Sequence, residues 1–229
     1  MLILVDKKIP DGAKENLSKY GELLELSTSG ITYEAISGHP DIFFFKSPDK
    51  LFVAPNLPNE YFEILNKYAV PFKKGSSPVE AKYPLSARYN AVADDNYFIH
   101  NLKITDQTIL QELSDIKHLI SVNQGYCRCS LLALKNNSFI TSDSGIYKAL
   151  LKENLNSLLV DTKQVLLPGF SHGFFGGACG IFENKIFLIG SLKYVQDAEN
   201  IKKYTSYLNY EIIELYNGPL FDGGGIFFI

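Results

Sequence analysis

Hydrophobic and polar positions along the chain form a block that recurs four times. Each block has an apolar stretch, a short polar turn and a second apolar stretch, and this pattern predicts a β-hairpin. The blocks read DIFFFKSPDKLFVAPN from Asp41, YNAVADDNYFIHN from Tyr89, CSLLALKNNSFITSD from Cys129 and GACGIFENKIFLIGS from Gly177. Their second stretches are anchored by Phe52, Phe98, Phe139 and Phe187. Spacings of 46, 41 and 48 residues between these anchors indicate an internal repeat.

A helix-like stretch and a third apolar stretch follow each hairpin. The helical stretches cover 59–67, 106–113, 144–152 and 195–207. Asp143 precedes the third of them and is interpreted as its N-cap. The third apolar stretches read AVPF at 69–72, HLISV at 118–122, QVLLP at 164–168 and YEIIELY at 210–216. Each unit therefore predicts the order strand, strand, helix, strand.

The two ends of the chain supply the parts of one more unit. The C-terminal FDGGGIFFI has the pattern of a first strand, and the N-terminal MLILVDKK has that of a second strand. A helical stretch at 11–20 and the apolar ELLELS at 22–27 follow. Joining the ends would place Ile3 45 residues after Phe187 and 49 before Phe52, which fits the period. We therefore expect the end strands to pair and close a ring without open sheet edges. The alternative is an open α/β sheet whose similar segments are coincidental.

Five such units, one of them split between the termini, resemble the pentein fold, the five-bladed α/β propeller of the guanidino-group-modifying enzymes. The whole chain, 1–229, would form one such domain. The stretches that carry the resemblance are GHPDIFFF at 38–45, QGYCRCS at 124–130, GFSHGFFGGACG at 169–180 and FDGGG at 221–225. They are most similar to a bacterial branch separate from the known deiminases. The resemblance implies a hydrolase or amidinotransferase acting on an arginine-like compound. A ribosome-binding anti-association factor shares the fold, so a non-catalytic binding protein is the alternative.

The repeat register places polar residues at matching positions around the expected axis. Counting back ten or eleven residues from the anchors selects Asp41, Cys129, Gly177 and Asp222, and in the second unit either Arg88 or Asn90. Carboxylates can hold a planar guanidinium through paired hydrogen bonds, and a thiolate can attack its carbon. A histidine can serve as acid or base. We therefore predict a site in which Asp41, Asp222, Arg88 and Asn90 bind substrate and Cys129, His39 and His172 are catalytic.

Each of these residues also has a structural interpretation. Cys129 could be a small buried hydrophobe, Asp41 a capping residue and Asp222 part of a β-bulge. Cys127 and Cys179 are interpreted as packing residues. In the hydrolases that the chain resembles, the nucleophilic cysteine lies late in the chain beside a glycine-rich final strand. The chain has Ile226 to Ile229 there, so either Cys129 has taken the role or the usual chemistry is absent.

Composition narrows the expected partners. The chain has 229 residues, 46% of them hydrophobic, and a formal net charge of −3, which does not favour a nucleic-acid surface. No apolar run is long enough to span a membrane, and Asp6 interrupts the apolar start too soon for a signal peptide. Three cysteines, two of them separated by one residue, form neither a disulfide framework nor a zinc pattern. We expect a cytoplasmic protein with no metal and no cofactor that binds a small cationic or amino-acid-like ligand.

Overall fold

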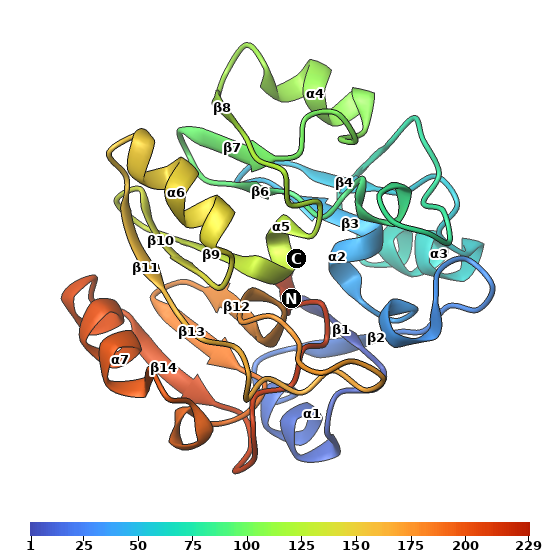
Figure 1. Ribbon diagram of the computed structural model, residues 1–229. Helices are drawn as coiled ribbons and strands as arrows, with labels where there is room; N and C mark the ends of the chain where they lie inside the picture. Colours follow the sequence, from blue (N-terminus) through green and yellow to red (C-terminus); the bar gives the residue numbers. More distant parts are fainter.

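The computed structural model describes all 229 residues and arranges them as five three-stranded sheets around a central axis (Figure 1). Each sheet is one blade, and its middle strand pairs antiparallel with the first strand and parallel with the third. The blades, each written in the order first, middle and third strand, are β3 (Phe44–Lys46), β4 (Leu51–Val53) and β5 (Lys73–Lys74); β6 (Val92–Ala93), β7 (Tyr97–His100) and β8 (His118–Ser121); β9 (Leu131–Leu134), β10 (Ser138–Thr141) and β11 (Asn156–Leu159); β12 (Cys179–Phe182), β13 (Lys185–Leu188) and β14 (Glu211–Glu214); and β15 (Phe227–Phe228), β1 (Leu2–Asp6) and β2 (Glu22–Leu26). The five-bladed α/β propeller predicted from the repeat is therefore confirmed.

One helix in each blade joins the middle strand to the third strand. These helices are α1 (Asp11–Leu17), α3 (Asn59–Lys67), α4 (Gln107–Leu113), α6 (Ser144–Lys152) and α7 (Ala198–Tyr207). Each buries one apolar face, as α6 does with Ile146 and Leu150. The Asp143 carboxylate accepts a hydrogen bond from the Ile146 N–H at 2.8 Å, which confirms it as the cap of α6. No helix of the protein is both long and apolar enough to cross a membrane.

The split blade closes the ring as predicted. Strand β15 pairs antiparallel with β1, with Ile3 opposite Phe228 and Leu4 opposite Phe227. Leu2 and Ile229 exchange two backbone hydrogen bonds of 2.9 Å. The Phe228 ring packs against Phe187, with a centroid separation of 4.9 Å. Both ends of the chain lie at the centre of the ring (Figure 1), so the terminal strands belong to the core.

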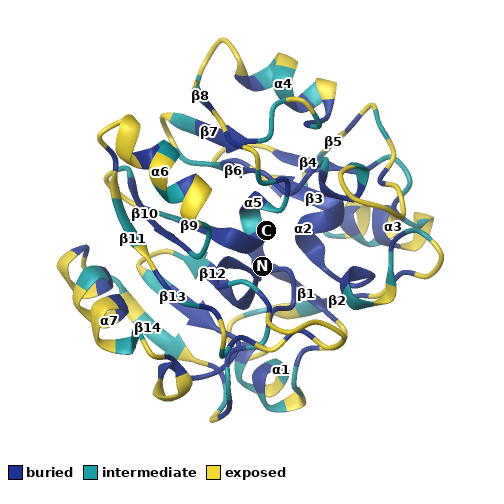
Figure 2. Cartoon of the chain, in the orientation of Figure 1, coloured by how far each residue is buried: buried dark blue, intermediate teal, exposed yellow.

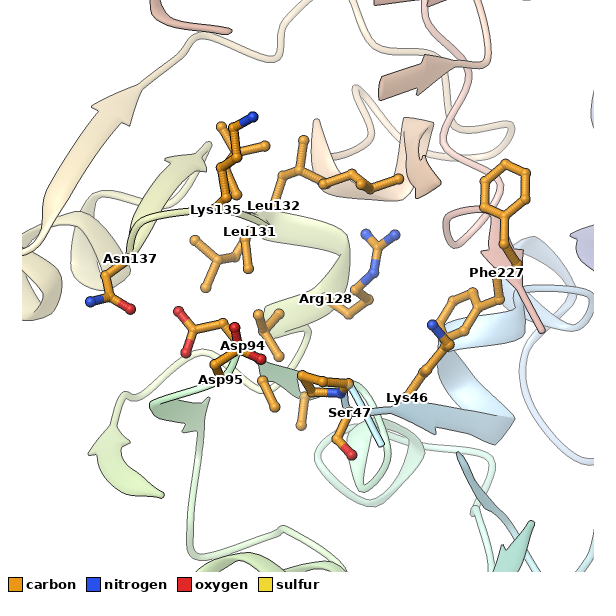
Figure 3. A pocket seen from close by; sticks show the side chains of 18 of the residues that line it. Lys46, Ser47, Asp94, Asp95, Arg128, Leu131, Leu132, Lys135, Asn137 and Phe227 are labelled. Carbon is orange, nitrogen blue, oxygen red and sulfur yellow. The ribbon is translucent and has the colours of Figure 1, made fainter. Parts of the chain in front are cut away.

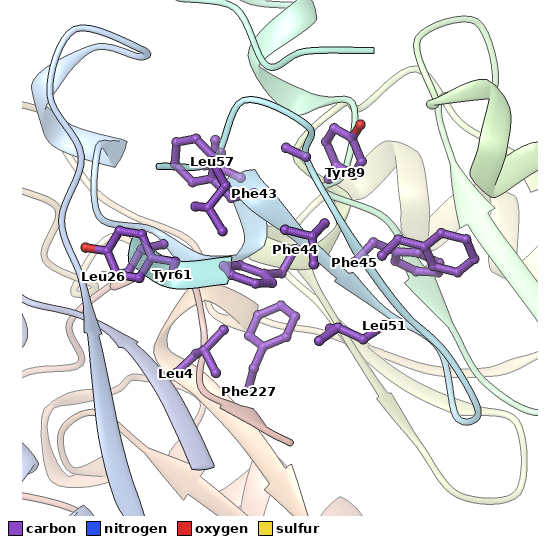
Figure 4. Packing of buried hydrophobic residues seen from close by; sticks show 14 of the residues in the cluster. Leu4, Leu26, Phe43, Phe44, Phe45, Leu51, Leu57, Tyr61, Tyr89 and Phe227 are labelled. Atoms are coloured by element: carbon purple, nitrogen blue, oxygen red, sulfur yellow. The ribbon is translucent and has the colours of Figure 1, made fainter. Parts of the chain in front are cut away.

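Buried residues concentrate in the first and middle strands of the blades, whereas the third strands and the outer faces of the helices are more exposed (Figure 2). The largest apolar cluster joins the first blade to the split blade. In it Phe227 of β15 lies beside Leu4, Phe44 and Leu51 (Figure 4). Contacts of this kind link segments from opposite ends of the sequence. The hydrophobic core therefore holds neighbouring blades together.

Two of the predicted third strands lie elsewhere in the structure. The third blade uses Asn156–Leu159 where 164–168 was predicted, and the first uses Lys73–Lys74 where 69–72 was predicted. Asn154 and Ala69 have positive φ angles of 55° and 52° and terminate the preceding helices. In the third blade the chain pairs with β10 as soon as α6 ends. In the first blade the predicted stretch includes Ala69, which belongs to the end of α3, so strand β5 begins later.

The first strands of the four predicted hairpins also begin two or three residues later than expected. Asp41 and Cys129 lie in one-turn helices, α2 (Pro40–Phe43) and α5 (Cys127–Ser130), which run directly into β3 and β9. Gly177 lies in a similar 3₁₀ turn, Gly176–Ala178, ahead of β12. These turns end on the axis beside the chain termini (Figure 1). They decide which side chains face one another there.

Candidate functional site: a buried polar cluster on the axis

Four of the residues selected by the repeat register meet on the axis. The Cys129 thiol donates a hydrogen bond of 2.8 Å to the Asp41 carboxylate. Asn90 accepts hydrogen bonds from the backbone N–H groups of Arg128 (2.7 Å) and Cys129 (3.2 Å), and its amide lies 3.4 Å from the thiol sulfur. Asp222 reaches the same region from the segment before β15, and its charge acts on both Asp41 and Cys129. We call Asp6, His39, Asp41, Asn90, Cys129 and Asp222 the axial cluster; all six are buried.

Glycine-rich backbone holds Asp222 in place. Its carboxylate accepts hydrogen bonds from the N–H groups of Phe174 (2.9 Å) and Gly224 (3.1 Å). A side chain at Gly177 would place its Cβ 1.9 Å from Asp222 Oδ1, so only glycine fits. Gly224 has a φ of +68° and lies against His39, where a Cβ would be 2.3 Å from that of the histidine. Glycine at these two positions therefore lets the backbone approach Asp222 and His39 closely.

His39 lies between two carboxylates. Its Nε2 is 3.8 Å from Asp6 Oδ2, and its Nδ1 is 4.0 Å from Asp222 Oδ1. Asp6 also accepts a hydrogen bond from the Lys8 N–H at 2.7 Å. Sequence reasoning missed Asp6, although one signal was available. It is the polar residue that ends the apolar run of β1, next to the axis in the split blade.

Burial dominates the electrostatics of the axial cluster. Loss of solvation raises the pKa of Asp41 to about 7 and the pKa values of Asp6 and Asp222 to about 6. Burial and the adjacent Asp41 charge raise the pKa of the Cys129 thiol well above its ordinary value. Burial and the charge of Lys8 lower the pKa of His39 to about 3, so its imidazole is neutral. His39 Nδ1 and Asp41 Oδ1 are buried without a hydrogen-bond partner.

A pocket of about 410 Å³ opens onto one side of this cluster. Asp6, His39 and Asp222 form its polar wall, Tyr33 and Phe170 its aromatic wall, and Lys8 and Glu34 also line it. The rings of Tyr33 and Phe170 lie 5.8 Å apart between centroids. We call this the axial pocket. Asp41, Asn90 and Cys129 do not line it.

Two of the predicted site residues lie outside the cluster. Arg88 is partly buried away from the cluster and pairs with Glu80 at 3.3 Å, so Asn90 takes the axial position in the second blade. His172 is exposed, and its Nδ1 lies 3.0 Å from the Gly173 carbonyl oxygen. The backbone turns after this histidine, and the Phe174 N–H contacts Asp222 in place of the imidazole. Cys127 and Cys179 are fully buried in the core, as predicted.

The cluster also brings together side chains that could hold a metal ion. Ligand atoms of His39, Cys129 and Asp222 all lie within 4.8 Å of one another. The spacing of the cysteines along the chain predicted no metal site. The three candidate ligands come from three different blades, so spacing along the chain has no signal for them.

The five three-stranded blades around a polar axis are the pentein fold, which this chain shares with several solved structures. Similar solved structures include an agmatine deiminase from C. jejuni, at 15% identity over 93% of this chain and 74% of that chain, with a TM-score of 0.54. DDAH from Pseudomonas aeruginosa, a Cys-to-Ser variant complexed with citrulline, matches at 8% identity over 93% and 91%, with a TM-score of 0.56. SxtG, an amidinotransferase of saxitoxin biosynthesis from Microseira wollei, matches at 9% identity over 93% and 87%, with a TM-score of 0.50.

A narrower relationship comes from the sequence. The chain belongs to a family described as "Family of unknown function (DUF6873)", whose model matches residues 4–227. No curated protein matches the sequence. At 8–15% identity, the likeness to the solved enzymes concerns the fold, and the activity has to be argued from the axial cluster itself.

Proposed function

We propose that the axial cluster binds a small organic cation of the guanidino or amino-acid-like type, which enters through the axial pocket. One observation carries this proposal: Asp6, Asp41 and Asp222 are at most 1% exposed, and none forms an ion pair with a lysine or arginine. Buried carboxylates close to one another destabilise a fold unless a partner compensates their charge. A bound cation would provide that compensation.

The axial pocket offers groups suited to a planar cation. Asp6 and Asp222 could accept its N–H groups, and the unpartnered His39 Nδ1 could accept another. The faces of Tyr33 and Phe170 could pack against a guanidinium plane. Asp41 would act from behind this wall through its charge. Agmatine deiminase and the citrulline complex of DDAH have the same fold, which supports a small amino-acid-like ligand.

Thiol chemistry at Cys129 is the second candidate, because its sulfur lies 2.8 Å from Asp41 and near the Asn90 amide. The thiol proton would pass to Asp41, and the thiolate would attack the guanidinium carbon. The C–N bond to the leaving amine would then break as that amine takes the proton. Water would finally cleave the C–S bond and restore the thiol. Binding remains the primary conclusion, because Cys129 is 3% exposed and does not line the axial pocket.

Titration calorimetry with arginine, agmatine and dimethylarginine tests the binding proposal, with citrulline as the neutral counterpart. We expect the cations to bind at least about tenfold more tightly than citrulline, because each charge-assisted hydrogen bond is worth at least this factor. Affinity should increase from pH 5 to pH 8 as the carboxylates with pKa values of about 6 and 7 ionise. Asp6→Asn should weaken binding by about tenfold, whereas Glu34→Gln, at an exposed carboxylate of the same pocket, should change it by less than about twofold.

Three results would contradict this proposal. One is equal binding of citrulline and arginine, and another is the absence of any cation binding by the parent protein while it still unfolds cooperatively. A third is stoichiometric zinc in the purified protein by mass spectrometry. His39, Cys129 and Asp222 would then already be occupied by a metal ion.

Alkylation and turnover separate the two candidates. The pKa values of all three cysteines are raised by burial, so a binding protein should show three slowly alkylated thiols at neutral pH. An enzyme should release ammonia or an amine from a bound cation. Cys129→Ala should abolish that release and keep binding, whereas Cys127→Ala, the matched control, should keep both.

A further inference from the structure

A second cavity lies at the other end of the first strands, away from the axial pocket. It has a volume of about 330 Å³ and is bordered by the hairpin turns of three blades and by strand β15 (Figure 3). We call it the hairpin cavity. No residue lines both it and the axial pocket. Its size falls in the range of small-molecule sites.

One side of the hairpin cavity carries two cations without acidic partners. The Arg128 guanidinium donates to the carbonyl oxygens of Gly176 (2.7 Å) and Cys179 (2.9 Å) and forms no ion pair. Only two of its five N–H donors are used in these bonds. Lys46 also forms no ion pair, whereas Lys50 in the same hairpin pairs with Glu112. The surrounding protein partly desolvates the Lys46 ammonium and lowers its pKa.

Apolar side chains line the space between these cations and the opposite wall. Phe227 packs against Arg128, whose guanidinium carbon lies 5.5 Å from the ring centroid. Figure 3 shows Lys46 rising toward Phe227 on the same side as Arg128, with Leu131 and Leu132 beyond. This surface suits a hydrocarbon body held next to a charged end.

The opposite wall is acidic. Figure 3 places Asp94 and Asp95 there beside Asn137. Asp94 Oδ1 accepts from the N–H groups of Asn96 and Tyr97, and its buried Oδ2 has no partner. Neither aspartate forms an ion pair, so this wall repels a second negative charge.

We infer that the hairpin cavity binds a small organic monoanion with an apolar body, its carboxylate held by Arg128 and Lys46. The apolar body lies along Leu131, Leu132 and Phe227. Asp94 and Asp95 exclude dicarboxylates by like-charge repulsion. This site is independent of the axial pocket, because it differs in its residues and in the charge of its ligand.

Four related probes test this inference by saturation-transfer NMR on the full chain: 4-phenylbutyrate, acetate, adipate and 4-phenylbutylamine. We expect 4-phenylbutyrate to bind at least about tenfold more tightly than the other three, since each of them lacks one required feature or adds a repelled charge. Lys46→Met should weaken its binding by about tenfold, and Lys50→Met, at a lysine that has an acidic partner, by less than about twofold. Asp95→Asn should improve adipate binding and leave 4-phenylbutyrate unchanged.

Equal binding of 4-phenylbutyrate and 4-phenylbutylamine would overturn the inference, as would identical affinities in the two lysine variants. Arg128→Lys keeps the charge and removes the fork of donors, so it should weaken binding less than Lys46→Met combined with Arg128→Lys. Chemical-shift changes should map to residues of β9 and β15. Changes confined to Tyr33 and Phe170 would place the ligand in the axial pocket and would also contradict the inference.

Discussion

Arg128 and Cys129 are consecutive residues of α5, yet their side chains enter sites of opposite charge. Cys129 donates to Asp41 in the acidic axial cluster. Arg128 reaches the carbonyls of Gly176 and Cys179 and lines the hairpin cavity. A single helical turn therefore divides the polar interior of the propeller into an acidic part and a basic part. The positive charge of Arg128 partly offsets the rise in the pKa values of Asp41 and Asp222, so the two parts interact electrostatically.

Both sites depend on the closing strand. Strand β15 follows directly after Asp222 and the glycines of the axial cluster, and its phenylalanines line the hairpin cavity. Pairing of β15 with β1 thus builds both sites at once. The difference in charge arises from side chains, whereas the closure that positions them arises from backbone pairing and apolar packing.

Removing the closing strand should have the largest effect, because it abolishes both sites. Deletion of 225–229 takes away the buried side chains of Ile226, Phe227 and Phe228, each worth about 2 kcal/mol or more. We expect a chain without a cooperative thermal transition by circular dichroism. Tyr207→Ser, at a tyrosine that is 79% exposed, should melt like the parent. A truncated chain that melts near the parent temperature would show that closure is not needed.

A methyl group at Gly177 should damage the acidic part in particular. Its Cβ would lie 1.9 Å from Asp222 Oδ1, so Gly177→Ala should lower the free energy of unfolding by about 3 kcal/mol through overpacking. Gly12→Ala is the control, because its Cβ would lie 3.6 Å from the nearest atom and helix α1 favours alanine. Equal stabilities of the two variants in urea titration would mean that Asp222 can move aside without loss.

Asp41→Asn should change the pH dependence of stability. The folded protein raises the pKa of Asp41 to about 7, so the folded state holds a proton that the unfolded state releases near pH 4. The contribution of protonated Asp41 to the free energy of unfolding is therefore fully present below pH 4 and is lost as the pH rises through 7. Between pH 5 and pH 8, the free energy of unfolding of Asp41→Asn should increase relative to that of the parent by on the order of 2 kcal/mol.

The Asp41→Asn comparison uses denaturant unfolding of both proteins at each pH. Asp49→Asn makes the same change of charge at an exposed turn and serves as the baseline. A difference between Asp41→Asn and the parent that stays constant from pH 5 to pH 8 would contradict the description of Asp41 as a buried, uncompensated carboxylate. Loss of stability at every pH would point to a structural hydrogen bond to Cys129 in its place.

The smallest effect concerns the lysines of the first hairpin. Lys50 is part of an exposed pair with Glu112, so Lys50→Met should change the free energy of unfolding by less than about 0.5 kcal/mol. Lys46→Met removes an ammonium that has no acidic partner, so stability should stay the same or increase slightly. A loss of more than about 1 kcal/mol in Lys46→Met would indicate an intramolecular role for this lysine and weaken the argument for a ligand.

The repeated pattern of apolar and polar residues determined the five blades and the closed ring. It also determined that Asp41, Cys129 and Asp222 lie at matching positions, because strand pairing requires a regular register and residues equally far from their anchors meet on one axis. The pattern did not decide whether Asn90 or Arg88 takes the axial position in the second blade. Hydropathy alone also could not position the third strands of the first and third blades. Those strands are shifted because the preceding helices terminate at Ala69 and Asn154, where the chain takes positive φ.

Only the tertiary structure decided which way each polar side chain points. The one-turn helices α2 and α5 rotate successive residues to different sides, so Cys129 meets Asp41 while Arg128 enters the hairpin cavity. His39 joins Asp6 and Asp222 because the first blade and the split blade converge there. His172 stays at the surface because its loop turns away before the axis. The sequence determines strand register through a periodic signal along the chain. The contacts on the axis arise between blades distant in sequence, where no such period exists.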